Sequence, residues 1–404
     1  MTAYEPYKIE DVILASQKKL FNVISTFAGG GGSSTGYKLA GGKVLCANEF
    51  VEEAVATYRA NYPDTLVICD DIKSLPWNFY KLEPGTLDIL DGSPPCSAFS
   101  ISDPKGMNNK WKGAISDTTH TYFNDEGDAV SAGDVKVATG IKKYSDGKTV
   151  EAIEDLFLEF IRIASGLRPK IIVAENVKGI TLEANREKLI EFVNKFERIS
   201  PGYLVTYRVL NAAEYGVPQS RRRCFFIAIR EDIAAKVGIN FMNMDDIVFP
   251  KKTTPMYRDR DVWCGGVSIA SAIEGIENDP DEVQMLRDYC AKSFQFKYIS
   301  IIPFNPEKVI KPSGSCFNIK RPSPQLPCPT LTQTGQKLAP SGVMHYAENR
   351  KLTIVEMKRI MSLPDDFKLT GTFDQQAERI GRMVAPKMMA AIASNLYEKV
   401  LSKL

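Results

Sequence analysis

Cys96 is the side chain whose type and position most strongly indicate covalent chemistry. It follows Gly92-Ser93-Pro94-Pro95, where two prolines force a turn because they fix φ and cannot continue a helix or a central strand. The preceding residues 87–91, LDILD, have the composition of a buried strand that ends at this turn. Open α/β sheets bind their ligands at the carboxyl ends of parallel strands. A thiol at such a place suits a nucleophile, and a buried structural cysteine is the plainer alternative.

A glycine-rich turn follows the first predicted strand, residues 20–25. Glycines occupy positions 29–32, and Ser33, Ser34 and Thr35 are candidates to cap a helix that runs through Leu39. Strand, glycine turn and helix start form the cradle that doubly wound folds use for nucleotides, because glycine lets the backbone approach a ligand closely. The spacing does not satisfy GxGxxG, so nicotinamide binding is not supported, and a flexible turn is the alternative.

Acidic side chains follow the next predicted strands. Glu49 ends the strand over residues 43–48, 17 residues after Gly32. An acid at this place commonly binds ribose hydroxyls. Asp70 and Asp71 follow the strand over residues 65–69, and one of them is suited to accept a hydrogen bond from an exocyclic amine. Solvated charge at strand ends is the alternative, but the repetition along the chain favours a ligand site.

A second group of polar residues lies later in the chain. Glu175-Asn176-Val177 follows a predicted strand at residues 171–174, after a helix at residues 151–166 with apolar residues at helical spacing. Arg221, Arg222 and Arg223 come directly before a strand at residues 224–229. The three arginines could be a solvated face or anion ligands at the entrance of that strand.

Composition excludes several classes of protein. The length of 404 residues predicts two or three domains. The net charge of +2 neither requires nor forbids binding to nucleic acid. Its eight cysteines contain no CxxC pair, so zinc-ligand spacing is absent and no metal is expected. Residues 32–36 match GxSxG, but with only two histidines in the chain a serine hydrolase is poorly supported. We expect neither a secretory signal nor a membrane helix.

Taken together and in order, these segments resemble the cytosine-5 DNA methyltransferase family of prokaryotic or phage type. The resemblance extends from about residue 21 to about residue 396, with a poorly matching middle third. It rests on five segments: STFAGGGGSSTGYKLAGG (25–42), GSPPCSAFS (92–100), AENVKGI (174–180), PQSRRRCFFIAIR (218–230) and ERIGRMVAPKM (378–388). It implies a doubly wound, mostly parallel α/β sheet of the Rossmann-like type used by S-adenosylmethionine-dependent methyltransferases, with a smaller, irregular target-recognition domain.

The resemblance also implies roles for individual residues. Cys96 would add to carbon 6 of a flipped-out cytosine in double-stranded DNA, and Glu175 would hold the exocyclic amine and ring nitrogen 3. Arg223 would bind the carbonyl oxygen at position 2, Arg221 would contact phosphate, and Asn176 would support the turn that positions Glu175. The implied S-adenosylmethionine site comprises Phe27, Ala28, Gly29, Gly31, Gly32, Glu49, Phe50, Asp71, Ile72, Pro94, Arg382 and Val384, with Glu49 on the ribose and Asp71 on the adenine amine.

One position departs from the family pattern. The family usually has Gly-Asn-Ser-Val where this chain has Gly381-Arg382-Met383-Val384. A guanidinium near a sulfonium is unfavourable unless an anion lies between them. Arg382 could turn toward the cofactor's own carboxylate, toward DNA phosphate or toward Glu378. Alternatively, the donor could be carboxy-S-adenosylmethionine, whose extra carboxylate Arg382 would bind, and the product would be 5-carboxymethylcytosine.

Other functions remain open at the level of sequence. An RNA cytosine-5 methyltransferase would use the same fold and chemistry, although the segment from Arg321 onward favours DNA. A catalytically idle binding protein is disfavoured because Cys96, Glu175 and Arg223 are all present. An amino-methyltransferase would need an Asn/Asp-Pro-Pro-aromatic turn where this chain has Ser93-Pro94-Pro95-Cys96.

The resemblance divides the chain into three parts. Residues 1–230 would form the catalytic and cofactor-binding domain, with a long catalytic loop at 97–150. Residues 231–375 would form the target-recognition domain, and residues 376–404 a C-terminal helix that returns to the catalytic domain. We expect a monomer in the cytoplasm, associated with the nucleoid through DNA.

Overall fold

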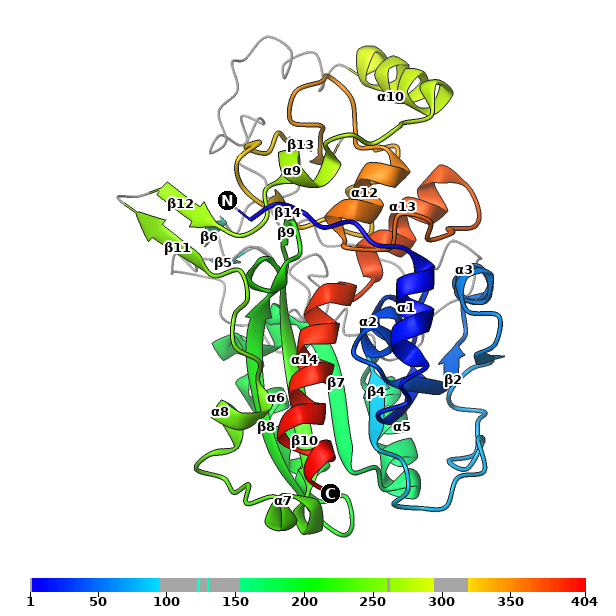
Figure 1. Ribbon diagram of the computed structural model, residues 1–404, viewed down its shortest axis with the longest axis vertical. Coiled ribbons are helices and arrows are strands. Elements are labelled where there is room, and N and C mark those ends of the chain that lie inside the picture. The colour runs from blue at the N-terminus through cyan, green and yellow to red at the C-terminus, as the bar shows by residue number, and fades with distance from the viewer. Residues whose placement is uncertain are drawn as a thin grey trace, which may run out of the picture.

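The computed structural model describes residues 2–94, 122–123, 129–130, 153–259, 262–293, 319–339 and 341–404. Its centre is a seven-stranded sheet of order β3-β2-β1-β4-β7-β10-β8 (Figure 1). These strands are β1 Asn22–Thr26, β2 Lys43–Glu49, β3 Leu66–Cys69, β4 Ile89–Gly92, β7 Ile171–Val177, β8 Tyr203–Asn211 and β10 Arg222–Arg230. The first five are parallel, and β10 is antiparallel to both of its neighbours. The predicted doubly wound, mostly parallel α/β fold is confirmed.

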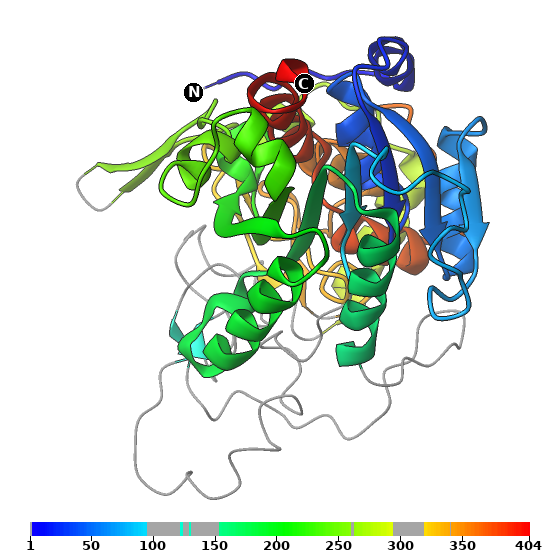
Figure 2. The same cartoon turned by 90° about the horizontal axis from the view of Figure 1, so that it is seen from below.

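Helices cover both faces of this sheet. On one face lie α1 (Ile9–Ser16), α2 (Gly32–Leu39) and α14 (Pro386–Lys399), and on the other α5 (Ile153–Leu167) and α6 (Arg186–Glu197) (Figure 2). Alternate strand residues face the two layers: Val23, Ile89 and Val173 join one hydrophobic cluster, and Ile24, Leu90 and Ile172 join the other. Burial on both faces explains why apolar residues stand next to one another in these strands, as at Val23-Ile24, Ile89-Leu90 and Ile171–Ala174.

The helix after the glycine turn begins differently from the prediction. Its N-cap is Gly31, with a φ of 97° that favours glycine, and no side chain caps it. The prediction that Ser33, Ser34 or Thr35 caps this helix is therefore wrong, because these residues lie inside the first turn and are buried. The predicted end at Leu39 is confirmed.

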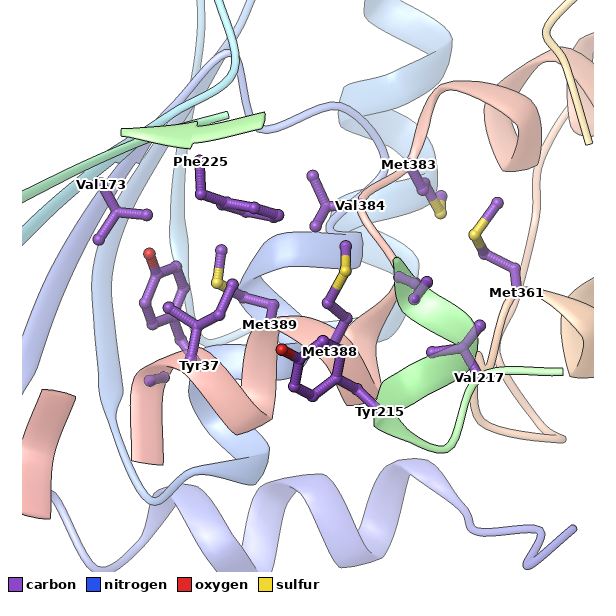
Figure 3. Close-up of a cluster of buried hydrophobic side chains, with 14 of the residues drawn as sticks. Tyr37, Val173, Tyr215, Val217, Phe225, Met361, Met383, Val384, Met388 and Met389 are labelled. Carbon is purple, nitrogen blue, oxygen red and sulfur yellow. The ribbon is translucent and has the colours of Figure 1, made fainter. Parts of the chain in front are cut away.

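The C-terminal helix α14 packs against α2. A Cβ atom added to Gly36 would lie 2.5 Å from the Cβ of Met389, so the absence of a side chain there lets the helices approach closely. Met388, Met389 and Val384 lie with Tyr37 around Phe225 and Val173 of the sheet (Figure 3). The last helix is thereby part of the same core as the first strands.

The remaining elements are shorter. The helices are α3 (Glu52–Asn61), α7 (Glu231–Lys236), α8 (Met244–Val248), α9 (Ile269–Ile273), α10 (Pro280–Lys292), α12 (Ile354–Ile360) and α13 (Phe373–Arg382). The 3-10 turns are η3 (Lys178–Thr181), η4 (Glu183–Asn185), η5 (Ala212–Tyr215) and η6 (Leu401–Lys403). The short strand pairs are β5–β6 (Tyr122–Phe123, Ala129–Val130), β9–β14 (Gln219–Ser220, Cys328–Pro329), β11–β12 (Met256–Asp259, Val262–Gly265) and β13–β15 (Ile319–Lys320, Gly342–Val343). Among the described helices none has the length and apolarity to cross a membrane.

The elements after the main sheet separate into two groups. Met244 and Val248 of α8 join the hydrophobic cluster of the sheet, so that core continues past residue 230. The later helices α9, α10, α12 and α13 gather beyond one end of the sheet, and Ile269, Met357 and Ile380 extend the same hydrophobic cluster to α9, α12 and α13 (Figure 1). This second group therefore lies next to the strand ends of the sheet rather than on its faces.

Candidate active site at the carboxyl edge of the sheet

Strand register brings the predicted site residues to one edge. Thr26, at the end of β1, pairs with Asn48 on one side and with Gly92 on the other, and Gly92 pairs with Ala174. The residues that directly follow these four positions therefore share the carboxyl edge of the sheet. They are Phe27, Glu49, Ser93 and Glu175. The edge lies at the switch point between β1 and β4, where doubly wound folds bind ligands.

Glu175 and Arg223 form an ion pair at this edge. Arg223 Nε lies 3.1 Å from Glu175 Oε1, and their side chains are 9% and 11% exposed. Antiparallel pairing of β7 and β10 sets this contact, because Phe225 is opposite Glu175 and Arg223 is opposite Val177. A carboxylate and a guanidinium held side by side can hydrogen-bond a planar amide-like ring edge.

Asn176 stabilises the end of β7. It is buried, and its side-chain Oδ1 accepts a hydrogen bond of 2.8 Å from the backbone N–H of Val177. Its own backbone is opposite Cys224 in the sheet. The side chain thus fixes the backbone immediately after Glu175.

Arg221 lies in the interior of the protein, which corrects the prediction that it contacts phosphate. It is 1% exposed, and its guanidinium donates to the carbonyl oxygens of Leu331 (3.0 Å) and Gly381 (2.9 Å). These partners belong to an irregular segment and to the end of α13. Arg221 therefore joins β10, that segment and α13, and DNA phosphate cannot reach it in this arrangement.

The glycine turn and Glu49 are directly bonded. Glu49 Oε2 accepts a hydrogen bond of 2.8 Å from the N–H of Gly29, and Oε1 accepts from the N–H groups of Phe50 and Val51 at 2.9 Å each. Phe27 and Gly29 have φ values of 53° and 54°. A Cβ on Gly29 would meet nothing within 4 Å, so open space lies in front of this backbone. An open glycine face beside a fixed carboxylate fits a nucleoside-containing cofactor.

The other predicted cofactor residues lie around this turn. A Cβ on Gly32 would lie 2.5 Å from the carbonyl oxygen of Val384, so the turn packs directly on the segment after α13. Ala28 and Pro94 are buried, and Phe50 is half-buried. They lie one or two residues after the ends of β1, β4 and β2, respectively.

Asp71 is exposed at the end of β3, whereas Ile72 is buried. Asp71 Oδ1 accepts a hydrogen bond of 3.0 Å from the N–H of Lys73. Asn48 joins this strand end to β2 by donating to the carbonyl of Asp70 at 2.9 Å. Asp71 thus stands at the same edge as Glu49, one strand further out.

Arg382 is paired with Glu378. Its Nη2 lies 2.5 Å from Glu378 Oε1, one turn earlier on α13, and Lys337 Nζ lies 2.5 Å from the other oxygen of the same carboxylate. Of the partners that the sequence left open for Arg382, Glu378 is the one that it contacts here.

Sequence reasoning missed Asp91, the last acid before the proline turn. It is 1% exposed, and the hydroxyl groups of Ser25, Ser33 and Tyr37 all donate to its carboxylate. Burial raises the pKa of Asp91 to about 6. The signal in the sequence is a charged residue within a strand that is otherwise apolar and buried on both faces.

Cys96 and Pro95 lie outside the described residues, as does nearly all of the predicted catalytic loop at 97–150. The strand β4 that precedes Cys96 is described as far as Pro94, two residues before it. Within the described ranges, His, Cys, Asp and Glu side chains form no group of three that could hold a metal ion.

The fold and the site together place this protein in the class of α/β methyltransferases. The sequence profile of the C-5 cytosine-specific DNA methylase family matches residues 21–123 and 141–398. Similar proteins include the Type II methyltransferase M1.HphI of Haemophilus parahaemolyticus, which is 26% identical over 92% of this chain and 85% of its own length. The Type II methyltransferase M.Sau96I of Staphylococcus aureus is 28% identical over 96% of this chain and 79% of its own length.

Solved structures show the same fold. The Dnmt2 methyltransferase of S. pombe aligns with a TM-score of 0.54 and 16% identity, over 94% of this chain and 98% of its own. The family profile matches well over half of the chain, so this protein belongs to the C-5 cytosine-specific DNA methylase family. It is a DNA cytosine-5 methyltransferase.

Proposed function

We propose that this enzyme modifies a flipped-out cytosine in duplex DNA through a covalent adduct with Cys96. The observation that carries the proposal is the Glu175–Arg223 ion pair beside β4, the strand that leads to Cys96. Carbon 5 of cytosine is a weak nucleophile until a thiolate adds to carbon 6. Because a base inside the duplex is inaccessible, it must be extruded before the thiolate can reach it.

Glu175 and Arg223 would bind different atoms of the flipped-out cytosine. Glu175 would bind the exocyclic amine and ring nitrogen 3, so that a proton at that nitrogen accompanies formation of the bond from sulfur to carbon 6. Arg223 would bind the carbonyl oxygen at position 2 and stabilise the negative charge that the ring gains. Carbon 5 would then accept the methyl group of the donor, whose sulfonium would leave as a neutral thioether. A base, in our proposal a water molecule, would take the proton from carbon 5, which would expel the thiolate of Cys96 and restore the aromatic ring.

S-adenosylmethionine is the donor that we propose, and it would supply an electrophilic methyl group. Glu49 would bind its ribose hydroxyls, Asp71 its adenine amine, and the open backbone face of Gly29 would lie against it. Phe27, Phe50, Ile72, Pro94 and Val384 would provide its apolar surroundings. The Type II names of the relatives suggest that this chain is the modification enzyme of a restriction–modification pair.

A carboxylated donor is the less favoured alternative, because Arg382 already has Glu378 as its anionic partner. Replacing Arg382 by Asn separates the two donors. If Arg382 recognises a carboxylate on the transferred carbon, the variant should shift preference toward ordinary S-adenosylmethionine. An unchanged preference would exclude that role.

The experiment is nucleoside mass spectrometry on duplex DNA and on transfer RNA, each incubated with the protein and either donor. We expect 5-methylcytosine in DNA with S-adenosylmethionine, and its loss in Cys96→Ala. Duplex DNA containing 5-fluorocytosine should trap the wild-type protein covalently, because fluorine cannot leave as a proton does. Modification of RNA alone, or methylation that survives Cys96→Ala, would contradict the proposal.

A further inference from the structure

Asp91 is a fully buried carboxylate whose bonds reach across two parts of the site. Its Oδ2 accepts hydrogen bonds from Ser25 Oγ (2.7 Å) and Ser33 Oγ (2.6 Å), and its Oδ1 accepts one from Tyr37 Oη (3.1 Å). Thr26 Oγ1 also donates to its backbone carbonyl at 3.1 Å. The residue is thus fixed through both its side chain and its main chain.

Two of the three side-chain partners of this carboxylate lie on the helix that follows the glycine turn. Ser33 lies in the first turn of α2, two residues after the N-cap Gly31, and Tyr37 lies one turn further along the same helix. Ser25 lies on β1, the strand that leads into the glycine turn. Asp91 itself lies on β4, five residues before Cys96 in the sequence. One carboxylate therefore joins the helix behind the glycine turn to the strand that leads to the nucleophile.

Packing alone does not require a carboxylate here. Ile89, two residues earlier on the same face of β4, meets the same hydrophobic cluster with an apolar side chain. Taking a carboxylate out of water is costly unless hydrogen bonds compensate, and here three hydroxyl groups are committed to it. The buried carboxylate of Asp91 lowers the stability of the folded protein, which suggests that it has a function that a leucine or isoleucine would not provide.

We propose that Asp91 is a positioning residue that holds the methyl donor in place relative to Cys96. This inference rests on the proposed function. Through Ser33, the carboxylate fixes the first turn of α2 and hence the glycine turn against β4. A displacement of about 1 Å between reacting groups can lower a rate about 100-fold, so such a link bears directly on turnover.

The sharpest test compares Ser33→Ala with Ser25→Ala. Both variants remove one buried hydroxyl that donates to the same oxygen at nearly the same distance, so a purely structural role predicts similar losses of stability and similar function. If Asp91 positions the cofactor, Ser33→Ala should weaken S-adenosylmethionine binding about tenfold and lower the single-turnover rate by at least as much. Ser25→Ala, which keeps the first turn of α2 bonded to Asp91 through Ser33, should change either quantity by less than about threefold.

Two variants of Asp91 complete the test. Asp91→Leu keeps the branching at Cγ, although its side chain is larger, and removes every acceptor. It should weaken cofactor binding at least as much as Ser33→Ala while leaving the affinity for DNA unchanged. Asp91→Asn keeps the shape, and hydroxyl groups can either donate or accept, so it should restore most of the binding. If Asp91→Leu does not fold, the two serine variants still decide.

The outcomes separate this inference from the proposed function. Binding is measured by calorimetry without DNA, and transfer is measured with DNA. Equal effects of the two serine variants on binding, in an enzyme that methylates DNA, would overturn the role of Asp91 alone. A wild-type protein that binds S-adenosylmethionine but modifies no DNA would overturn the proposed function, and the binding data would still judge Asp91.

Discussion

Arg221 and Arg223 show how two similar residues acquire different roles within three positions. Arg221 is enclosed by carbonyl groups from distant segments, whereas Arg223 meets the carboxylate of Glu175 at the edge of the sheet. The sequence predicts that arginines stand at the entrance of β10, but not which of them faces the site. The reason is that the partners of Arg221 lie 110 and 160 residues further along the chain.

Substituting each arginine by lysine should separate these roles. In Arg221→Lys a shorter side chain with one nitrogen replaces the two separate nitrogens that reach Leu331 and Gly381, so at least one of these bonds should be lost and the free energy of unfolding should fall by about 1–3 kcal/mol. In Arg223→Lys the planar fork is lost, so turnover should fall at least about tenfold with a smaller loss of stability. Denaturant titrations and methylation rates per folded molecule measure the two effects. Equal losses of stability and equal losses of rate in both variants would contradict this division.

The stability of the protein should depend on pH through Asp91. Burial raises the pKa of Asp91 from 3.8 to about 6, and the nearby Glu175 carboxylate adds to this effect. The folded state therefore binds a proton more tightly than the unfolded state, and this contribution to stability is lost as pH rises from about 4 to about 6. At pH 7 the cost amounts to at most about 3 kcal/mol, given 1.36 kcal/mol per pKa unit.

Asp91→Asn removes this cost, because an amide has no charge to bury. We expect the variant to be more stable than the wild type at pH 7 by about 1–3 kcal/mol, and the advantage to disappear near pH 4. Urea titrations across this range measure the difference. An advantage that stays constant from pH 4 to pH 7 would show that Asp91 is not the group responsible.

At the scale of elements, the order of strands and helices around the cradle could be predicted because each has a local signal. The strand, the glycines and Glu49 follow one another within 30 residues, and they meet as the prediction required. The inward orientation of Ser33 could not be predicted, because its acceptor lies 58 residues away and a serine after glycines also suits a cap. The orientation of Ser33 is set by a contact between two elements, α2 and β4, and not by the sequence within α2.

Lys351 organises an irregular segment beside α13. Its buried ammonium donates to the carbonyl groups of Gly335 (2.8 Å), Lys337 (2.5 Å), Ala339 (3.1 Å) and Ser341 (3.0 Å). Lys337, in the same segment, forms an ion pair with Glu378 on α13. A single cation thus shapes the backbone that reaches the helix bearing Arg382.

Lys351→Met should release this segment, because methionine fills the space but offers no donor. We expect faster amide hydrogen exchange over residues 335–339, with the rest of the sheet unchanged. Lys358→Met is the matched control, since that buried lysine donates to carbonyl groups of Asp365 and Phe367 instead. Equal exchange in both variants over residues 335–339 would contradict the role given to Lys351.

At the scale of the whole molecule, the two ends of the chain share one core. Helix α14 lies against α2, and its methionines reach the same cluster as Phe225 and Val173 of the sheet (Figure 3). The sequence predicts a C-terminal helix within residues 376–404, and the structure has α14 at Pro386–Lys399. Its site of contact depends on a glycine in another helix, which no local pattern around α14 reveals.

Gly36→Ala should therefore disturb the packing of α14 against α2. The added methyl group would lie 2.5 Å from Met389 Cβ and 2.7 Å from the carbonyl oxygen of Pro386, so α14 must shift. Overpacking of this kind costs about 1–3 kcal/mol, because a close-packed core cannot absorb a methyl group without moving backbone. Because α2 also carries Ser33, the shift should weaken binding of S-adenosylmethionine as well as lower the melting temperature. Glu398→Ala, an exposed substitution on the same helix, is the control and should change neither the affinity for S-adenosylmethionine nor the melting temperature. If Gly36→Ala has the same affinity and melting temperature as this control, the packing of α14 does not affect the cofactor site.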